Sequence, residues 1–127
     1  MIKGVGTDIL AIKRLRQIME SQDSNLFLTR VYTDNELNQG ALRTDSLLYY
    51  ATRFAGKEAV FKSLGLGSSH IDLREIEILE TESGQPSVNL LGRMKTWAIE
   101  KGITVLHLSL SYDTDYVVAF AVADSSQ

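Results

Sequence analysis

The chain has 127 residues, of which 44% are hydrophobic and 23% are charged, and its formal net charge at pH 7 is -3. This size and composition predict one globular domain over residues 1–127, and the negative charge argues against general nucleic-acid binding. No apolar run is long enough to span a bilayer, and the N-terminus lacks the apolar segment of a secretory signal, so a cytoplasmic protein without membrane attachment is expected.

The first predicted element is a strand over Ile2–Ile9. Under the two-residue period of a strand, Gly4 and Gly6 lie on the same side as Asp8. Because glycine has no side chain, little bulk surrounds the Asp8 carboxylate. Asp8 is therefore predicted to lie in an open position at the end of this strand.

A basic amphipathic helix is predicted for Leu10–Glu20. Its apolar residues recur at helical spacing, whereas Lys13, Arg14 and Arg16 fall outside that stripe and face solvent. A basic helix face on a chain of net negative charge suggests a specific acidic partner. An ordinary solvated helix face is the alternative.

Two more helices are predicted before the middle of the chain. Thr33–Glu36 has the pattern of a capping box, which starts a short helix that Gly40 is expected to end. A long helix follows over Asp45–Leu64. Residues 65–72, "GLGSSHID", are then predicted to form a mobile, glycine-bearing loop.

One carboxylate interrupts the apolar face of the long helix. The 3.6-residue period places Leu47, Ala51, Phe54, Glu58 and Phe61 on one face. Buried carboxylates are rare unless they are paired or bind a metal, so Glu58 needs a partner. An i,i+4 ion pair with Lys62 is the simpler interpretation, and a metal site is the other.

The second half of the chain combines strands with one helix. The expected elements are strands Arg74–Leu79 and Ser87–Leu91, a helix over Leu91–Lys101 closed by Gly102, and strands Ile103–Ser111 and Tyr116–Ala123. Their order predicts an α+β fold with a largely antiparallel sheet packed around the long helix. The last strand, "YVVAFAVA", is apolar on both faces, so both faces are expected to be covered.

Asp8 and Glu58 are two carboxylates that could serve one metal ion. The chain has no cysteine, so a metal site must use oxygen ligands or the two histidines, His70 and His107. A hard cation such as Mg²⁺ is therefore the expected metal.

A phosphate site would have to use side chains and loop amides. The sequence contains neither the G-x-G-x-x-G pattern of dinucleotide-binding turns nor a P-loop. Lys57 and Lys62 flank Glu58, and Gly65 follows the helix, which makes these residues a candidate cradle for a polyphosphate. A solvated lysine pair and an ordinary helix end are the alternative. His107, on the polar face of its predicted strand, could donate to a phosphate or to a neighbouring side chain.

Several segments together resemble one enzyme family. "GVGTDI" near the N-terminus and "RFAGKEAVFKSLG" further along are similar to the two signature segments of holo-[acyl-carrier-protein] synthase, the short, stand-alone type of phosphopantetheinyl transferase. "SGQP" and "HLSLS" extend the resemblance over the whole chain. The resemblance implies transfer of the 4'-phosphopantetheine arm from coenzyme A to a serine of apo acyl carrier protein, in fatty acid biosynthesis, with release of adenosine 3',5'-bisphosphate.

The resemblance also implies roles for individual residues. Carried over by motif, Asp8 and Glu58 would bind Mg²⁺ and Lys62 would contact the pyrophosphate, so that these three residues carry the catalysis. Either Glu58 or a metal-bound water could take the serine proton. The remaining implied contacts are Arg53, Lys57, Gly65 and His107 for coenzyme A, and Lys13, Arg14 and Arg16 for the carrier protein.

A homotrimer with active sites at the subunit interfaces is a further implication, with Arg53 supplied by the neighbouring chain. The sequence departs from the family pattern at Tyr112, where relatives often carry a second histidine, and at Gly56, where alanine is more usual. Two other functions stay open from the residues alone. One is a different magnesium-dependent phosphoryl or phosphodiester enzyme that uses Asp8 and Glu58, and the other is a noncatalytic module that binds coenzyme A or a carrier protein.

Overall fold

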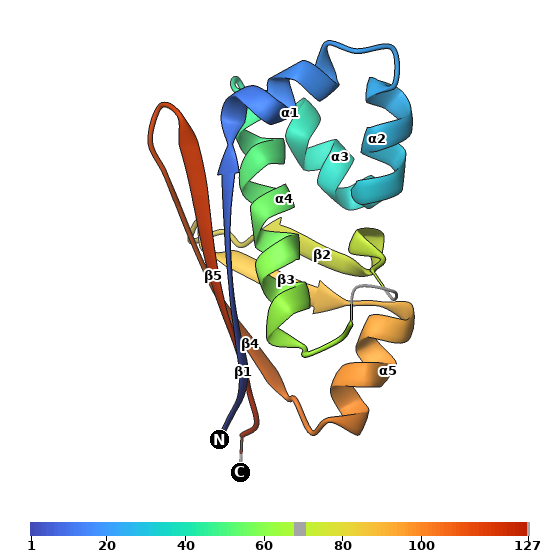
Figure 1. Ribbon diagram of the computed structural model, residues 1–127, viewed down its shortest axis with the longest axis vertical. Helices are drawn as coiled ribbons and strands as arrows, with labels where there is room; N and C mark the ends of the chain where they lie inside the picture. Colours follow the sequence, from blue (N-terminus) through green and yellow to red (C-terminus); the bar gives the residue numbers. More distant parts are fainter. Residues whose placement is uncertain (68–70, 127) are drawn as a thin grey trace.

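The computed structural model describes residues 1–67 and 71–126, so His70 and its two predecessors in the expected loop lie outside the described residues. Its elements are β1 (Ile2–Ala11), α1 (Ile12–Met19), α2 (Ser24–Val31), α3 (Asp34–Ala41), α4 (Ser46–Ser63), the 3-10 helix η2 (Leu73–Glu75), β2 (Ile76–Glu80), β3 (Pro86–Leu90), α5 (Gly92–Glu100), β4 (Val105–Tyr112) and β5 (Tyr116–Asp124) (Figure 1). Within the described ranges, no helix is long and apolar enough to cross a membrane.

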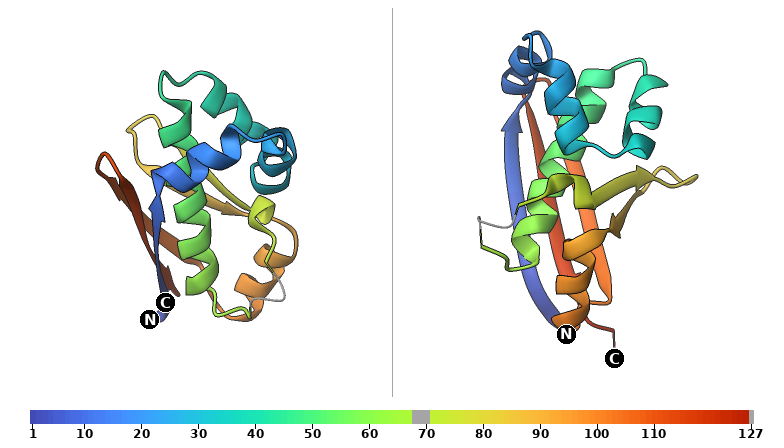
Figure 2. Two further views of the ribbon diagram at one scale, coloured as in Figure 1. Left: turned by 45° about the horizontal axis from the view of Figure 1, so that its top comes forward. Right: turned by 90° about the vertical axis from the view of Figure 1, so that its right-hand side faces the viewer.

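The strands form two antiparallel groups on either side of the long helix α4. β1, β5 and β4 make a three-stranded sheet in that order, and β2 pairs with β3 in a separate hairpin. Figures 1 and 2 show α4 running along one face of the three-stranded sheet, with α1, α2 and α3 gathered near its N-terminal end and α5 beside its C-terminal end. The predicted α+β fold, with antiparallel strands around one long helix, is confirmed.

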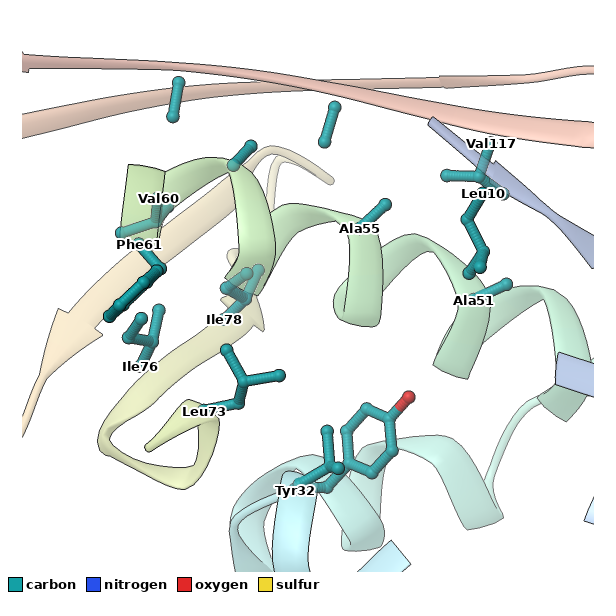
Figure 3. Packing of buried hydrophobic residues seen from close by; sticks show 14 of the residues in the cluster. Leu10, Tyr32, Ala51, Ala55, Val60, Phe61, Leu73, Ile76, Ile78 and Val117 are labelled. Atoms are coloured by element: carbon teal, nitrogen blue, oxygen red, sulfur yellow. The ribbon is translucent and has the colours of Figure 1, made fainter. Parts of the chain in front are cut away.

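Helix α4 approaches the sheet through small residues. Ala51, Ala55 and Ala59 are fully buried, and Figure 3 shows Ala51 and Ala55 directed toward the strands while Tyr32 and Leu73 lie on the other side of the helix. Short side chains let the helix axis come close to the sheet. The apolar surface that this packing removes from water stabilises the fold by roughly 25 cal/mol per Å².

Two glycines let β1 touch the backbone of α4. A Cβ atom on Gly6 would lie 2.0 Å from the carbonyl oxygen of Ala59, and one on Gly4 would be similarly close to the next turn of the helix. Such a backbone-to-backbone approach is possible only without side chains. Because Gly4, Gly6 and Asp8 share one side of the strand, the contact brings Asp8 to the middle of α4, where Glu58 lies.

Three details differ from the sequence-based expectations. Helix α2 was not expected, and it is held by tertiary packing in which the Phe27 ring lies 5.8 Å from that of Phe54. Gly40 does not end α3, which continues to Ala41; instead a Cβ on Gly40 would lie 2.5 Å from the Tyr50 hydroxyl oxygen, so the glycine makes room for that ring. Strand β1 continues beyond its predicted end because its last residues pair with β5.

The two faces of the three-stranded sheet differ in exposure. The leucines of β4 face α4 and are partly buried, while His107 and the serines of that strand are exposed, as predicted. On β5 the inner residues are buried, but Val118 is 40% exposed and Phe120 is 48% exposed on the outer face. The outer face therefore presents apolar side chains to the surroundings.

Candidate functional site

Asp8 and Glu58 line one hollow of about 310 Å³ formed by β1, α1, α2 and α4. Asp8 comes from the C-terminal half of β1 and Glu58 from the middle of α4, and Arg14 of α1 lines the same hollow. Much of the remaining wall is apolar and includes Phe27 and Phe54. The two carboxylates that the sequence predicted to share a site are brought together.

The surroundings of both carboxyl groups disfavour their charged forms. Burial raises the pKa of Asp8, and the Lys62 ammonium and the Arg14 guanidinium oppose that shift. Burial also raises the pKa of Glu58, and repulsion from the Asp8 carboxylate raises it further, against the opposing effect of Lys62. Two carboxylates that repel each other in a partly apolar hollow would be stabilised by a bound cation.

Lys62 pairs with Asp8 rather than with Glu58. Its Nζ donates to the carbonyl oxygen of Thr7 at 2.9 Å and lies 3.4 Å from Oδ1 of Asp8. Among the described residues there is no ion pair between Lys62 and Glu58, so the simpler interpretation of Glu58 is wrong. The ammonium is half-exposed and remains accessible to a ligand at the edge of the carboxylate pair.

The chemistry of the donor set fits a small hard cation. Across residues 1–67 and 71–126, no group of three or more His, Cys, Asp or Glu side chains could hold a metal ion. Mg²⁺ is usually bound by one or two carboxylates together with substrate phosphates and water. Asp8 and Glu58 therefore suit a Mg²⁺ ion that arrives with, or is completed by, a phosphate ligand.

Lys57 lies outside this hollow and is fully buried. Its Nζ is 2.7 Å from Oε1 of Glu36 and donates to the carbonyl oxygens of Leu73 at 2.9 Å and Ile76 at 2.5 Å. These partners use all three donors of the ammonium. The expectation that Lys57 contacts a phosphate is corrected: it ties α4 to α3, η2 and β2. From the sequence, Glu36 was expected only to complete the capping box with Thr33. In the structure the same carboxylate both completes that box and pairs with Lys57.

Arg53 lines a different hollow, of about 260 Å³, near the N-terminal half of α4. Its side chain is 7% exposed, its guanidinium carbon lies 4.3 Å from the Tyr49 ring centroid, and its Nε has no hydrogen-bond partner among the residues that the structure describes. Arg43 stacks on the same ring at 5.1 Å and was missed from the sequence, where no motif or period marks it. Tyr112 also lines this hollow.

Gly65 and His107 lie apart from the carboxylates. Gly65 turns the chain at the end of α4 with a φ of 75°, a value that favours glycine, and its N–H donates to the Lys62 carbonyl oxygen at 3.2 Å. Its amide is therefore already used. His107 is exposed on the outer face of the sheet, opposite Val122 of β5, whereas Asp8 lies on the side of β1 that faces α4.

The three basic residues of α1 do not share one surface. Arg14 lines the carboxylate hollow, whereas Lys13 and Arg16 line a shallow hollow with Asp115 and Tyr116 of the β4–β5 turn region. All three are exposed. A partner that contacts all of them would extend from the β4–β5 turn to the entrance of the carboxylate hollow.

Comparison with known proteins decides the family. The model of the 4'-phosphopantetheinyl transferase superfamily matches residues 4–121. The chain belongs to this superfamily. It is 40% identical over 124 residues to a holo-[acyl-carrier-protein] synthase of Clostridium kluyveri, covering 98% of this chain and 91% of the relative. It is 42% identical over 123 residues to that of Desulforudis audaxviator, covering 97% of this chain and 93% of the relative.

Solved structures of this transferase family have the same fold. The holo-[acyl-carrier-protein] synthase of Neisseria meningitidis superposes with a TM-score of 0.90 at 34% identity, covering 98% of this chain and all of that chain (100%). A Bacillus anthracis synthase in complex with CoA (3',5'-ADP) superposes with a TM-score of 0.79 at 29% identity, covering 99% of each chain. The resemblance to holo-[acyl-carrier-protein] synthases and the transferase-like fold are confirmed.

Proposed function

We propose that this chain transfers the 4'-phosphopantetheine group from coenzyme A to a serine of apo acyl carrier protein, giving the holo carrier and adenosine 3',5'-bisphosphate for fatty acid biosynthesis. The observation that carries the proposal is the pair of carboxylates, Asp8 and Glu58, in one hollow with Lys62 bonded to Asp8. Family membership along almost the whole chain supports the same reaction. Residues 1–127 form one transferase domain in this proposal, and a cytoplasmic location stays a prediction.

Asp8 and Glu58 would hold Mg²⁺ in this reaction. The fit rests on two oxygen donors in a partly apolar hollow, where each carboxyl group has a raised pKa and where Asp8 contributes to the shift of Glu58. When bound, the ion supplies electrostatic stabilisation of the phosphate oxygens. Both ligands come from rigid elements, a strand and a helix, so their spacing is set before the substrate binds.

Lys62 would stabilise the charge of the leaving group. As the serine Oγ–P bond forms, the Oγ proton passes to Glu58 or to a water, the bond from the β-phosphorus to the bridging oxygen breaks, and negative charge moves onto the released bisphosphate. An ammonium placed beside that oxygen stabilises the charge as it develops. The Thr7 carbonyl and the Asp8 carboxylate orient the Lys62 Nζ, and its half-exposed position leaves its third N–H accessible to a phosphate.

Incubation with coenzyme A, Mg²⁺ and an apo carrier protein, followed by mass measurement of the carrier, tests the proposed function. A mass gain of one phosphopantetheine per carrier supports the transferase. Release of adenosine 3',5'-bisphosphate without modification of the carrier would indicate a phosphodiester hydrolase instead. Binding of coenzyme A without either product would indicate a noncatalytic binding module.

Lys13, Arg14 and Arg16 would dock the acidic carrier protein. They are exposed on one short helix, and Arg14 lines the hollow that holds Asp8 and Glu58. A carrier bound along α1 would therefore place its serine near the carboxylates. Electrostatic complementarity of this kind speeds association and fixes orientation.

Charge reversal on α1 is expected to weaken carrier binding selectively. Arg14→Glu and Arg16→Glu should each raise the KM for the carrier roughly tenfold, because an attraction becomes a repulsion, and leave the KM for coenzyme A unchanged. Arg30→Glu, at an exposed site on α2, is the matched control. Arg16 does not line the carboxylate hollow, so its variant separates docking from effects on the metal ligands. An unchanged carrier KM in both variants would remove the docking role.

A homotrimer with shared active sites explains two features of one subunit. The outer face of the sheet exposes Val5, Ile9, Val118 and Phe120, a set of large apolar side chains that a second subunit could cover. Within one chain, Arg53 and His107 lie away from the carboxylate hollow. In a trimer these two residues, and Gly65, would contact coenzyme A bound mainly to a neighbouring subunit.

Phe120→Glu is expected to dissociate the assembly. Burying an unpaired charge at an apolar interface is unfavourable, so light scattering should give a monomer mass at working concentration, and transfer should fall at least about tenfold. Ile99→Glu on α5, whose side chain is 67% exposed, is the control and should leave both properties unchanged. A wild-type chain that is a fully active monomer would contradict both the trimer and the shared site.

A further inference from the structure

Trp97 of α5 makes a specific bond to the end of α4. Its indole Nε1–H donates to the carbonyl oxygen of Leu64 at 2.7 Å, across 33 positions of sequence. Leu64 is the C-cap of α4, one residue beyond the last helical residue, Ser63. The last carbonyl groups of a helix have no partner within the helix, so this bond satisfies one of them and joins the two helices.

The surroundings of Trp97 hold the indole in place. The Lys101 ammonium lies 4.8 Å from the centroid of its ring, and the Met94 side chain beside it is almost completely buried. Leu66 lines a mostly apolar hollow together with Met94 and Trp97. The bond at Leu64 therefore joins the end of α4 to α5, and Leu66, just beyond the turn at Gly65, lies at the edge of the same hollow.

The segment that Trp97 fixes carries a residue of the candidate site. Lys62 lies in the last turn of α4, and its carbonyl oxygen accepts the N–H of Gly65 that closes the helix. Loss of the anchor at Leu64 would let this turn fray, since helix ends open easily when their carbonyl groups are unsatisfied. The direction of the Lys62 ammonium depends on that turn staying helical.

We propose that Trp97 is a positioning residue for phosphate binding: its bond to Leu64 keeps the last turn of α4 intact, so that Lys62 meets the phosphates of coenzyme A. This inference rests on the proposed transferase function. Trp97 itself lines neither the carboxylate hollow nor the Arg53 hollow. Trp97 thus holds Lys62 in place and does not contact coenzyme A itself.

The test replaces only the indole N–H. The chain has a single tryptophan, so biosynthetic incorporation of β-(3-benzothienyl)alanine, in which sulfur takes the place of the N–H, changes this position alone. We expect the KM for coenzyme A to rise and kcat to fall, so that kcat/KM for coenzyme A drops about tenfold while the carrier KM stays within about twofold of normal, because Lys62 meets the phosphates both in the bound substrate and as the leaving group departs. Incorporation of 4-fluorotryptophan, which keeps the N–H, should restore the normal kcat/KM.

A second readout does not depend on activity. Amide hydrogen exchange at Leu64 and Gly65 should become faster in the benzothienyl protein and stay normal in the fluorotryptophan protein. Lys101→Met, which removes the cation above the ring but keeps the bond, is the matched control. Wild-type protein that fails to modify the carrier would overturn the proposed function and this role with it. An active wild type, with an unchanged kcat/KM for coenzyme A in the benzothienyl protein, would overturn the positioning role alone.

Discussion

Glu58→Gln and Asp8→Asn are each expected to lower phosphopantetheine transfer at least about a hundredfold while the chain stays folded. Each change keeps the shape of the side chain and removes one negative charge from the pair that would hold Mg²⁺. Calorimetric titration with Mg²⁺ and coenzyme A should show weakened cation binding in both variants. The mass of the carrier protein after incubation measures transfer directly.

Glu58→Gln is not expected to lower the stability of the fold, although it lowers activity. Burial and the neighbouring Asp8 raise the pKa of Glu58, so the ionised pair is unfavourable in the free protein. Glu58→Gln should therefore leave the thermal midpoint unchanged or raise it slightly. Glu82→Gln, an exposed change in the β2–β3 turn, is the control for losing one charge. Near-normal turnover by both metal-ligand variants with Mg²⁺ present would refute the shared-cation site.

Lys57→Met is expected to destabilise the fold by about 3–5 kcal/mol, because it leaves the buried carboxylate of Glu36 without its charged partner. For a chain of this size the thermal midpoint should fall by roughly 10 °C or more. The loss has a local component as well, since the carbonyl groups of Leu73 and Ile76 lose their donor. Thermal and urea unfolding of Lys57→Met and wild type, at the same protein concentration, measure the loss.

The double variant Lys57→Met with Glu36→Gln distinguishes pairing from packing. The double variant should lose less unfolding free energy than the two single variants lose together. Each single change leaves one buried charge without its partner, whereas the double change leaves none. Lys95→Met, an exposed lysine on α5, is the control and should change the unfolding free energy by less than about 0.5 kcal/mol. Additive losses in the double variant would contradict a stabilising Lys57–Glu36 pair.

Local patterns in the sequence predicted most of the helices and strands. The capping box at Thr33, the extent of the long helix and the alternation of β4 are short-range signals, and each has its expected form in the structure. Signals of this kind depend on the backbone period and on hydrogen bonds between near neighbours, which a single sequence displays. Helix α2 has no comparable signal, since its cap lacks a side-chain bond and its stability comes from aromatic packing.

Two glycines show how tertiary contacts change the meaning of a residue. Gly40 was expected to end a helix, but it clears space for the ring of Tyr50. Gly56 lowers helix propensity relative to alanine, yet a Cβ there would lie 2.8 Å from Cδ1 of Ile78, so its absence lets β2 pack against α4. Neither contact is visible in the sequence, because both partners are distant along the chain.

The sequence by itself determined the candidate carboxylates, the basic helix, the α+β class and the family resemblance, because periodicity and motif spacing are local properties of the chain. Only the tertiary structure decided which charged residues act together. Lys57 and Lys62 belong to one helix, yet Lys57 is buried against Glu36 and Lys62 is half-exposed beside Asp8. Which side of a helix is covered depends on the elements packed around it, and those contacts come from residues far away in the sequence.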